Sequence, residues 1–180
     1  ILMKLGMFYQ SMAQRTPESS PQREEMFDKA IDNLVESLNY FELPQSRLNL
    51  GAAYFHKGML YFNRARMPQY ANQSANMYKK GYEYFKKAEK EFESTLRIYP
   101  NYSLPHFNLA LIQYEYAQHA SQREQQKRQQ AFMEQRNAQA LDGPARDQAL
   151  ARAQKLEAEA DALHKQAMDL YAVAVERFKK

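Results

Sequence analysis

The chain has 180 residues, no cysteine, and a net charge of +4 that arises from 25 basic and 21 acidic residues. The absence of cysteine excludes disulfide bonds and thiolate metal sites, and charges this closely balanced do not by themselves call for a nucleic-acid partner. Only 5 glycines and 7 prolines interrupt a sequence rich in Ala, Gln, Lys, Arg and Glu, which predicts an all-α chain without strands.

The N-terminal segment predicts two helices. The first carries the pattern Leu5-Gly6-x-x-Tyr9 and ends before a break at residues 16–21. Pro21 suits the first turn of the second helix, which carries Ala30-x-x-x-Leu34 on its apolar side.

The next pair of helices is predicted to be longer. Leu43-Pro44-Gln45 separates it from the first pair, and Met67-Pro68-Gln69 divides its two helices. Its second helix is expected to begin near Asn72 or Ser74, because a regular apolar stripe follows these residues as far as Tyr99.

From about Ser103 to Lys180 the sequence predicts one long antiparallel hairpin. Its second helix alternates alanine and leucine in steps of three and four, as in a coiled coil, at Ala153, Leu156, Ala160, Leu163, Ala167, Leu170 and Ala174. A matching alanine ladder in the first helix is interrupted by Glu124. Asp142-Gly143-Pro144 predicts a turn at 142–145, with an arm at about 118–163 that extends beyond an ordinary hairpin.

The same short pattern opens and closes each of these three pairs. Leu-Gly-x-x-Tyr followed by Ala-x-x-x-Phe and then Pro resembles the tetratricopeptide repeat (TPR), in which small residues mark the closest approach of two antiparallel helices. The middle copy carries the resemblance best, with Leu50, Gly51, Tyr54, Gly58, Ala88, Phe92 and Pro100. The resemblance implies a TPR-like solenoid of about six helices in a single domain, 1–180, with repeats at 1–44, 45–101 and 102–180.

The gap inside the repeated pattern grows along the chain. Its opening leucine and its closing alanine are 25 residues apart at Leu5 and Ala30, 38 at Leu50 and Ala88, and 58 at Leu109 and Ala167. A repeat of about 34 residues leaves only about 13 for this interval. The extra residues lengthen the two helices of each hairpin, so we expect coiled-coil-like hairpins of which the C-terminal one is the longest.

The resemblance also implies a partner-binding groove, because helical repeat stacks bind on a concave surface, which the first helix of each pair lines in this family. The groove residues expected from it are Met3, Met7, Leu48, Ala52, Phe55, His56, Leu104, Phe107, Leu111 and Tyr114. Most of these are apolar, which suits an amphipathic helix or an extended apolar peptide. The alternative is that a neighbouring helix or a second copy of the chain fills the groove.

These observations predict a non-enzymatic protein–protein interaction scaffold whose long arms act in a larger assembly, for example in a bacterial envelope. One alternative is a structural subunit of a homo-oligomeric ring or array, which would associate through the long hairpins. A second alternative is RNA or DNA binding through basic helix faces at Lys79, Lys80, Lys86, Lys87, Arg123, Lys127 and Arg128.

No motif predicts a catalytic, cofactor or metal site. The four histidines lack ligand spacing, and no phosphate-binding loop or nucleophile motif is present. No apolar run is long enough to span a membrane. The lack of cysteine is compatible with a bacterial periplasm or envelope and with a cytoplasm. Because the chain opens on Ile1, we expect it to be part of a longer protein, which leaves room for a leader or a lipid anchor upstream.

Overall fold

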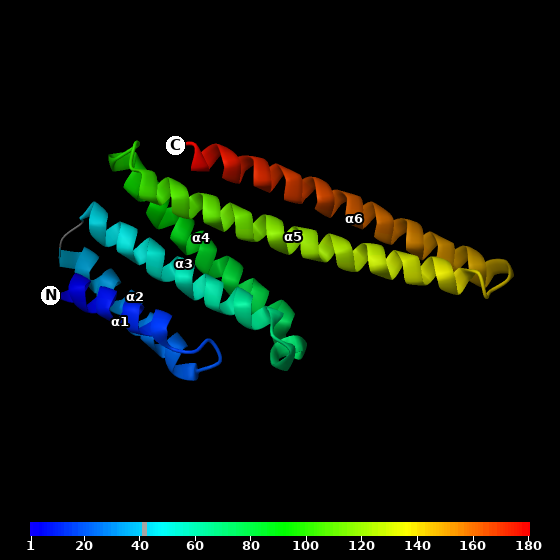
Figure 1. Cartoon of the computed structure of the whole chain (residues 1–180), viewed down its shortest axis with the longest axis horizontal. Helices are drawn as coiled ribbons and strands as arrows, with labels where there is room; N and C mark the ends of the chain where they lie inside the picture. The colour runs from blue at the N-terminus through cyan, green and yellow to red at the C-terminus, as the bar shows by residue number, and fades with distance from the viewer. Residues whose placement is uncertain (41–42) are drawn as a thin grey trace. The chain divides into compact units, whose positions relative to one another are not determined.

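A computed structural model describes residues 1–40 and 43–180. These residues form six α-helices and one short 3₁₀-helix and contain no strand, which confirms the predicted all-α class (Figure 1). The elements are α1 (Leu2–Arg15), α2 (Pro21–Tyr40), α3 (Pro44–Arg66), η1 (Pro68–Gln73), α4 (Ser74–Ile98), α5 (Ser103–Ala138) and α6 (Gly143–Phe178). Consecutive helices pair as antiparallel hairpins. Two compact units result, residues 1–112 with Lys180 and residues 113–179, and α5 contributes to both.

Prolines place the helix boundaries where the sequence predicts them. α2 begins at Pro21 and α3 at Pro44, since proline in the first turn gives up no helical hydrogen bond. α3 stops just before Pro68, and α4 starts at Ser74. The Ser74 hydroxyl donates a 2.9 Å hydrogen bond to the carbonyl of Ala65, which satisfies an acceptor that the end of α3 leaves open.

The turn of the C-terminal hairpin lies three residues earlier than predicted, at 139–142. Asp142 is the extended N-cap residue of α6, Gly143 has a φ of +55°, and Pro144 lies in the first helical turn. The Asp-Gly-Pro sequence therefore starts a helix here, because proline is well tolerated at that point.

Glycines mark the closest approach of the helices in the first two hairpins. A methyl group on Gly6 would lie 2.6 Å from Leu34 Cγ, and one on Gly51 would lie 2.7 Å from Phe92 Cε1. Each of these glycines opens the repeated pattern, and the side chain that it meets closes the pattern. The repeated residues are therefore the contact points between paired helices.

A second close approach stabilises the lengthened part of the α3–α4 hairpin. Methyl groups on Gly58 and Gly81 would each lie 3.2 Å from the other residue's carbonyl oxygen. They would also meet the rings of Phe85 and Phe62, whose centroids are 4.9 Å apart in the core. Two glycine contacts on one hairpin keep its long helices packed together.

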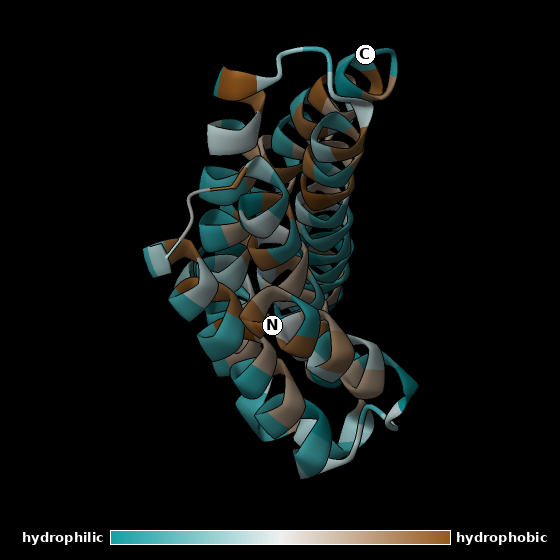
Figure 2. Cartoon of the chain, turned by 90° about the vertical axis from the view of Figure 1, so that its left-hand side faces the viewer, coloured by the Kyte–Doolittle hydropathy of each residue, from teal (hydrophilic) through white to brown (hydrophobic). Residues whose placement is uncertain are grey.

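The core of the first unit is apolar and helical throughout. One cluster joins Ile31, Leu34, Leu50 and Ala53, and another joins Ala13, Phe27 and Leu60. Hydrophobic and hydrophilic residues alternate around the helices, as the amphipathic pattern predicts (Figure 2). Within the described ranges, none of the helices combines the length and apolar character that a bilayer crossing requires.

The second unit is held by an alanine seam. Its alanines are 2 % or less exposed at Ala117, Ala131, Ala138, Ala149, Ala153, Ala160, Ala167 and Ala174. Ion pairs between the helices flank the seam, including Lys127–Glu159 at 2.7 Å and Arg152–Glu134 at 3.1 Å. Glu124, which interrupts the predicted ladder, lies 3.2 Å from His164 Nδ1 of the facing helix. A polar pair at a seam position favours one register of the two helices.

Candidate partner-binding surface

The ten predicted groove residues differ in exposure according to their helix. Those on α3 are covered, with Leu48 and Phe55 buried and Ala52 and His56 half-buried. Large exposed side chains come from α1 and α5. Met7, Leu104, Phe107 and Tyr114 are between 39 % and 47 % exposed, while Met3 and Leu111 are half-buried. Met7, Leu104 and Phe107 belong to the first unit and Tyr114 to the second.

Phe55 and His56 pack into the core of the first unit. The ring of Phe55 stacks on Phe85 of α4 with centroids 5.8 Å apart, and that of His56 stacks on Phe27 of α2 at 6.5 Å. Burial, together with the nearby positive charge of Arg23, lowers the pKa of His56 from 6.5 to about 4. His56 is therefore neutral at physiological pH and contributes a flat aromatic surface.

The partly exposed face of α3 is more polar than the predicted list. It carries Gln45, Asn49, Ala52 and His56, which are spaced by four, three and four residues and so share one side of the helix. Asn49 Oδ1 accepts a 3.1 Å hydrogen bond from Gln45, but the buried Asn49 Nδ2 has no hydrogen-bond acceptor among the residues that the structure describes. A buried donor without an acceptor costs free energy in the fold.

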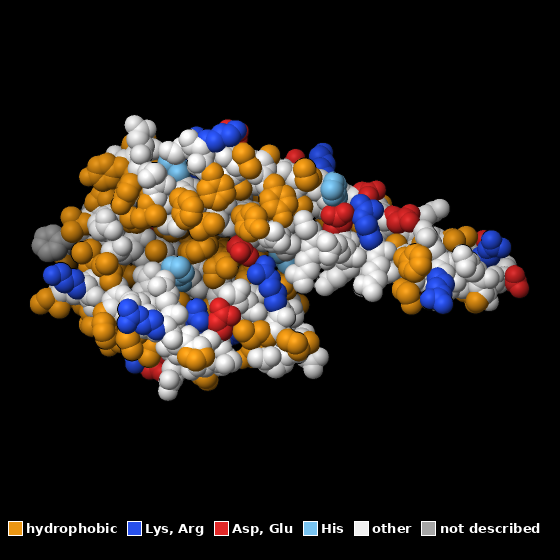
Figure 3. Space-filling model, in the orientation of Figure 1, with side chains coloured by type: hydrophobic (Ala, Val, Ile, Leu, Met, Phe, Trp, Pro, Cys, Tyr) orange, Lys and Arg blue, Asp and Glu red, His pale blue; other side chains and the backbone are white. Residues whose placement is uncertain are grey.

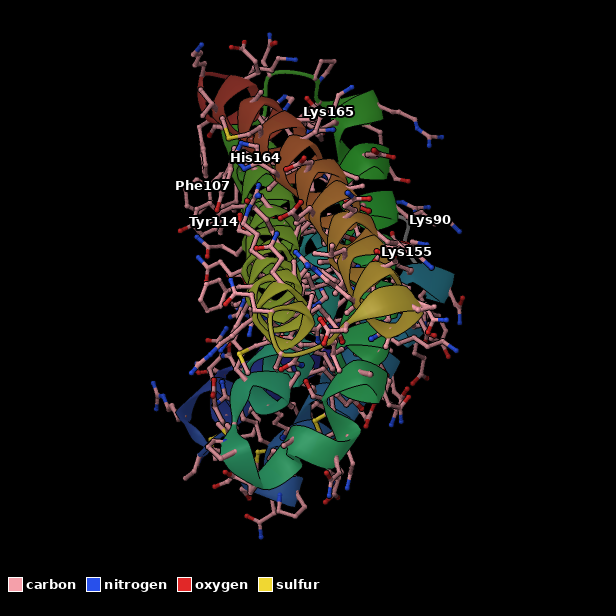
Figure 4. The ribbon with its side chains drawn as sticks, turned by 90° about the vertical axis from the view of Figure 1, so that its right-hand side faces the viewer. Lys90, Phe107, Tyr114, Lys155, His164 and Lys165 are labelled. Carbon is pink, nitrogen blue, oxygen red and sulfur yellow. The ribbon has the colours of Figure 1, made fainter. Side chains whose placement is uncertain are left out.

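Hydrophobic side chains also line one face of α5. Phe107 and Tyr114 are seven residues apart and point to the same side of the helix (Figure 4). Figure 3 shows hydrophobic side chains gathered along the first half of this helix. This face has the chemical character that the predicted groove requires.

The first unit contains a buried charged residue that the apolar pattern did not predict. Lys57 of α3 is only 2 % exposed, and its ammonium group donates to Asp28 of α2 and lies 4.7 Å from the ring centroid of Tyr84 of α4. Burial alone would lower the pKa of Lys57, but the hydrogen bonds with Asp28 and Tyr84 outweigh it and raise the pKa. Lys57 thus links three helices.

A second polar cluster holds the end of α3 against α2. Arg64 donates to Glu24 at 2.6 Å and to the carbonyls of Glu18 and Ser20, both at 2.9 Å. The hydroxyl of Tyr61 donates to the same Glu24 carboxylate. Burial would raise the pKa of Glu24, yet the donors Tyr61 and Arg64 outweigh it and lower the pKa. Lys57, Tyr61 and Arg64 lie on a different side of α3 from Asn49.

The basic residues expected for nucleic-acid binding have different surroundings in the two units. In the arm, Lys127 pairs with Glu159 and Arg128 pairs with both Glu124 and Asp161. In α4, Lys80 and Lys87 lie over the tyrosine rings of α3 and α4. The ion-paired side chains of the arm contribute little to binding phosphate, because that binding depends on unpaired positive charge.

In residues 1–40 and 43–180, no group of three or more His, Cys, Asp or Glu side chains could hold a metal ion. Comparison of the chain with protein-family models, with curated proteins and with solved structures finds no match. The proposals below therefore rest on the residues and their geometry.

Proposed function

We propose that this chain is a non-enzymatic protein–protein interaction scaffold built from three TPR-like repeats with lengthened hairpins. It binds an amphipathic helix or an apolar peptide on the face to which α1, α3 and the start of α5 contribute. The observation that carries the proposal is the exposure of Met7, Leu104 and Phe107, each 44 % to 47 % open to solvent in the first unit.

The chemistry of this face matches such a partner. Side chains of this size gain about 1.5–3 kcal/mol each when they move fully from water into an apolar contact. A bound segment with apolar residues at helical spacing matches these exposed apolar side chains.

The repeat assignment is supported by the contacts of the repeated residues. Gly6 meets Ala30 and Leu34, and Gly51 meets Phe92, as the small residue and its partner do in a TPR hairpin. Both pairs join consecutive helices of the chain.

Peptide selection tests the proposal. A displayed library of amphipathic helices is selected against the whole chain, and the affinity of the best peptide is measured by isothermal titration calorimetry. Changing Phe107→Asp or Met7→Asp should weaken binding at least tenfold, because a charge is then placed against the apolar side of the peptide.

The matched control is Met133→Asp, which places the same charge on a similarly exposed apolar side chain of the arm. Circular dichroism checks that each variant keeps its helical content. A peptide that binds Phe107→Asp and Met7→Asp as tightly as the unchanged protein would rule out this face.

A further inference from the structure

The arm carries a stripe of residues on one side of α5. Tyr114, Arg128 and Phe132 are separated by 14 and 4 residues, so they lie on one face of the helix. Gln118, one turn after Tyr114, donates a 2.8 Å hydrogen bond to the Tyr114 hydroxyl and lies on the same face. All four residues belong to the second unit.

A matching stripe follows α6. Leu150, Asp161, His164 and Met168 are separated by 11, 3 and 4 residues and share one face of that helix. Contacts between the helices place the two stripes on the same side of the hairpin, since Arg128 bonds Asp161 at 3.0 Å. Figure 4 agrees, because Tyr114 and His164 point to the same side.

This side of the hairpin is apolar at both ends and charged in the middle. Near the tip, Phe132 is 62 % and Leu150 is 37 % exposed, and nearer the base Tyr114 is 39 % and Met168 is 55 % exposed. The apolar ends are 18 residues apart on both helices, which corresponds to about 27 Å at 1.5 Å per residue. The exposed apolar residues of α5 and α6 therefore form one surface along the arm, with an apolar patch at each end and charged residues between the patches.

We propose that this surface docks against the same surface of a second copy of the chain. The two arms lie face to face with their tips at the same end, related by a two-fold axis that runs along the arm. Each α5 then faces α6 of the second copy, and the two hairpins together form a four-helix bundle.

Charge complementarity selects this arrangement. Arg128 of α5 already pairs with Asp161 at the same level of α6. The two-fold axis repeats this pair between the copies, so that Arg128 meets Asp161 of the second copy. The opposite, tip-to-base direction would bring Asp161 level with Glu157 of the second copy, and like charges at that distance repel.

The apolar residues match in the same arrangement. Phe132 and Leu150 of the second copy come into one apolar patch near the tip, offset by seven residues or about 10 Å along the arm, and Tyr114 and Met168 are offset in the same way near the base. From Tyr114 to the level of Leu150 the surface covers about 25 residues of helix, or about 38 Å, and two adjacent helices make it roughly 20 Å wide, which gives about 760 Å² per copy. Interfaces of standard size bury about 600–1,000 Å² per partner, so the arm is large enough to hold a dimer.

The first test is the mass of the full chain in solution, measured by analytical ultracentrifugation over a range of concentrations. We expect a dimer that Phe132→Asp weakens at least tenfold. Met133→Asp, a neighbouring residue with similar exposure that lies beside Leu156 on a different face, should leave the dimer unchanged. A monomer at every concentration, or a dimer that Phe132→Asp does not affect, overturns the dimer proposal. Neither result bears on peptide binding by the first unit.

A charge exchange tests the pairing between the copies. Arg128→Asp and Asp161→Arg each place like charges against each other in a homodimer, so each variant alone should dimerise less. When the two variants are mixed, both contacts between the copies join Asp to Arg, and the mixed dimer should form in preference. Equal amounts of mixed and unmixed dimers would contradict the predicted contact.

The direction of the two arms is tested by one distance. The chain has no cysteine, so Leu141→Cys gives a single site for a spin label at the tip. With the tips together, the two labels should lie within about 20 Å of each other. In the tip-to-base direction, Leu141 lies 18 residues from the centre of the stripe, which separates the labels by about 54 Å. The longer distance would overturn the proposed direction.

Discussion

Replacing Gly51 by alanine tests the closest approach of α3 and α4. The new methyl group would lie 2.7 Å from Phe92 Cε1 and 2.8 Å from Phe92 Cδ1, well inside van der Waals contact. Phe92 is fully buried, so its ring cannot turn aside into solvent. The helices must separate or the ring must leave its preferred rotamer.

Two effects of opposite sign decide the size of the change. An alanine in a helix interior is more favourable than glycine by about 1 kcal/mol. Forcing a methyl group into a packed core costs about 1–3 kcal/mol, and the short distances to a buried ring place Gly51 at the upper end of this range. We therefore expect Gly51→Ala to lower the free energy of unfolding by about 1–2 kcal/mol.

Urea unfolding followed by circular dichroism at 222 nm measures this change. The double variant Gly51→Ala, Phe92→Leu is the control, because a smaller side chain makes room for the methyl group. Its loss of stability should be at least about 1 kcal/mol less than the sum of the two single losses. If Gly51→Ala alone stabilises the protein by about 1 kcal/mol, as at an open helix position, the close approach does not exist.

Two further predictions concern buried ionisable groups of the first unit. Because the pKa of His56 is lowered to about 4 in the fold, the unfolded chain takes up a proton first as the pH falls below 6.5. Stability should therefore fall by about 3 kcal/mol between pH 6.5 and pH 4, and His56→Leu should remove that part of the slope in urea titrations at each pH. A slope that persists unchanged in His56→Leu would show that another group causes it. Asp28→Ala should cost about 1–3 kcal/mol in the same assay, since it leaves the buried Lys57 ammonium without its carboxylate. The double variant Asp28→Ala, Lys57→Met should recover part of the lost free energy of unfolding. No recovery would mean that the Asp28 carboxylate stabilises the fold through a contact other than Lys57.

The helices and their pairing could be predicted because local signals determine them. Proline at positions 21, 44 and 68 fixes where helices start and stop, and these bounds agree with the structure. The glycines at positions 6 and 51 recur with the repeat, and the structure places them at the helix contacts. The hairpin turn was predicted three residues late because Asp-Gly-Pro occurs both in turns and at helix starts.

The polar contacts and the exposure of individual side chains could not be predicted in this way. Lys57 occupies a buried position that an apolar stripe would assign to a hydrophobic residue, and its partners Asp28 and Tyr84 lie 29 and 27 residues away. Sequence periodicity gives the face of a helix, but it does not say which residue of another helix will meet it. For the same reason Leu48 and Phe55 were assigned to the groove surface, whereas they lie in contact with the core. The groove itself remains a prediction.

Methionine methyl groups offer the most direct test that the first unit binds a partner on the proposed face. The whole chain is labelled with ¹³C at its methionine methyls, and the peptide selected from the library is added while NMR spectra are recorded. Met7 is exposed on α1 and Met3 is half-buried beside it, whereas Met133 lies on the arm. The proposed function predicts that the signals of Met3 and Met7 shift as the peptide binds and that the signal of Met133 does not move. A bound peptide that shifts Met133 and leaves Met3 and Met7 unchanged would contradict it.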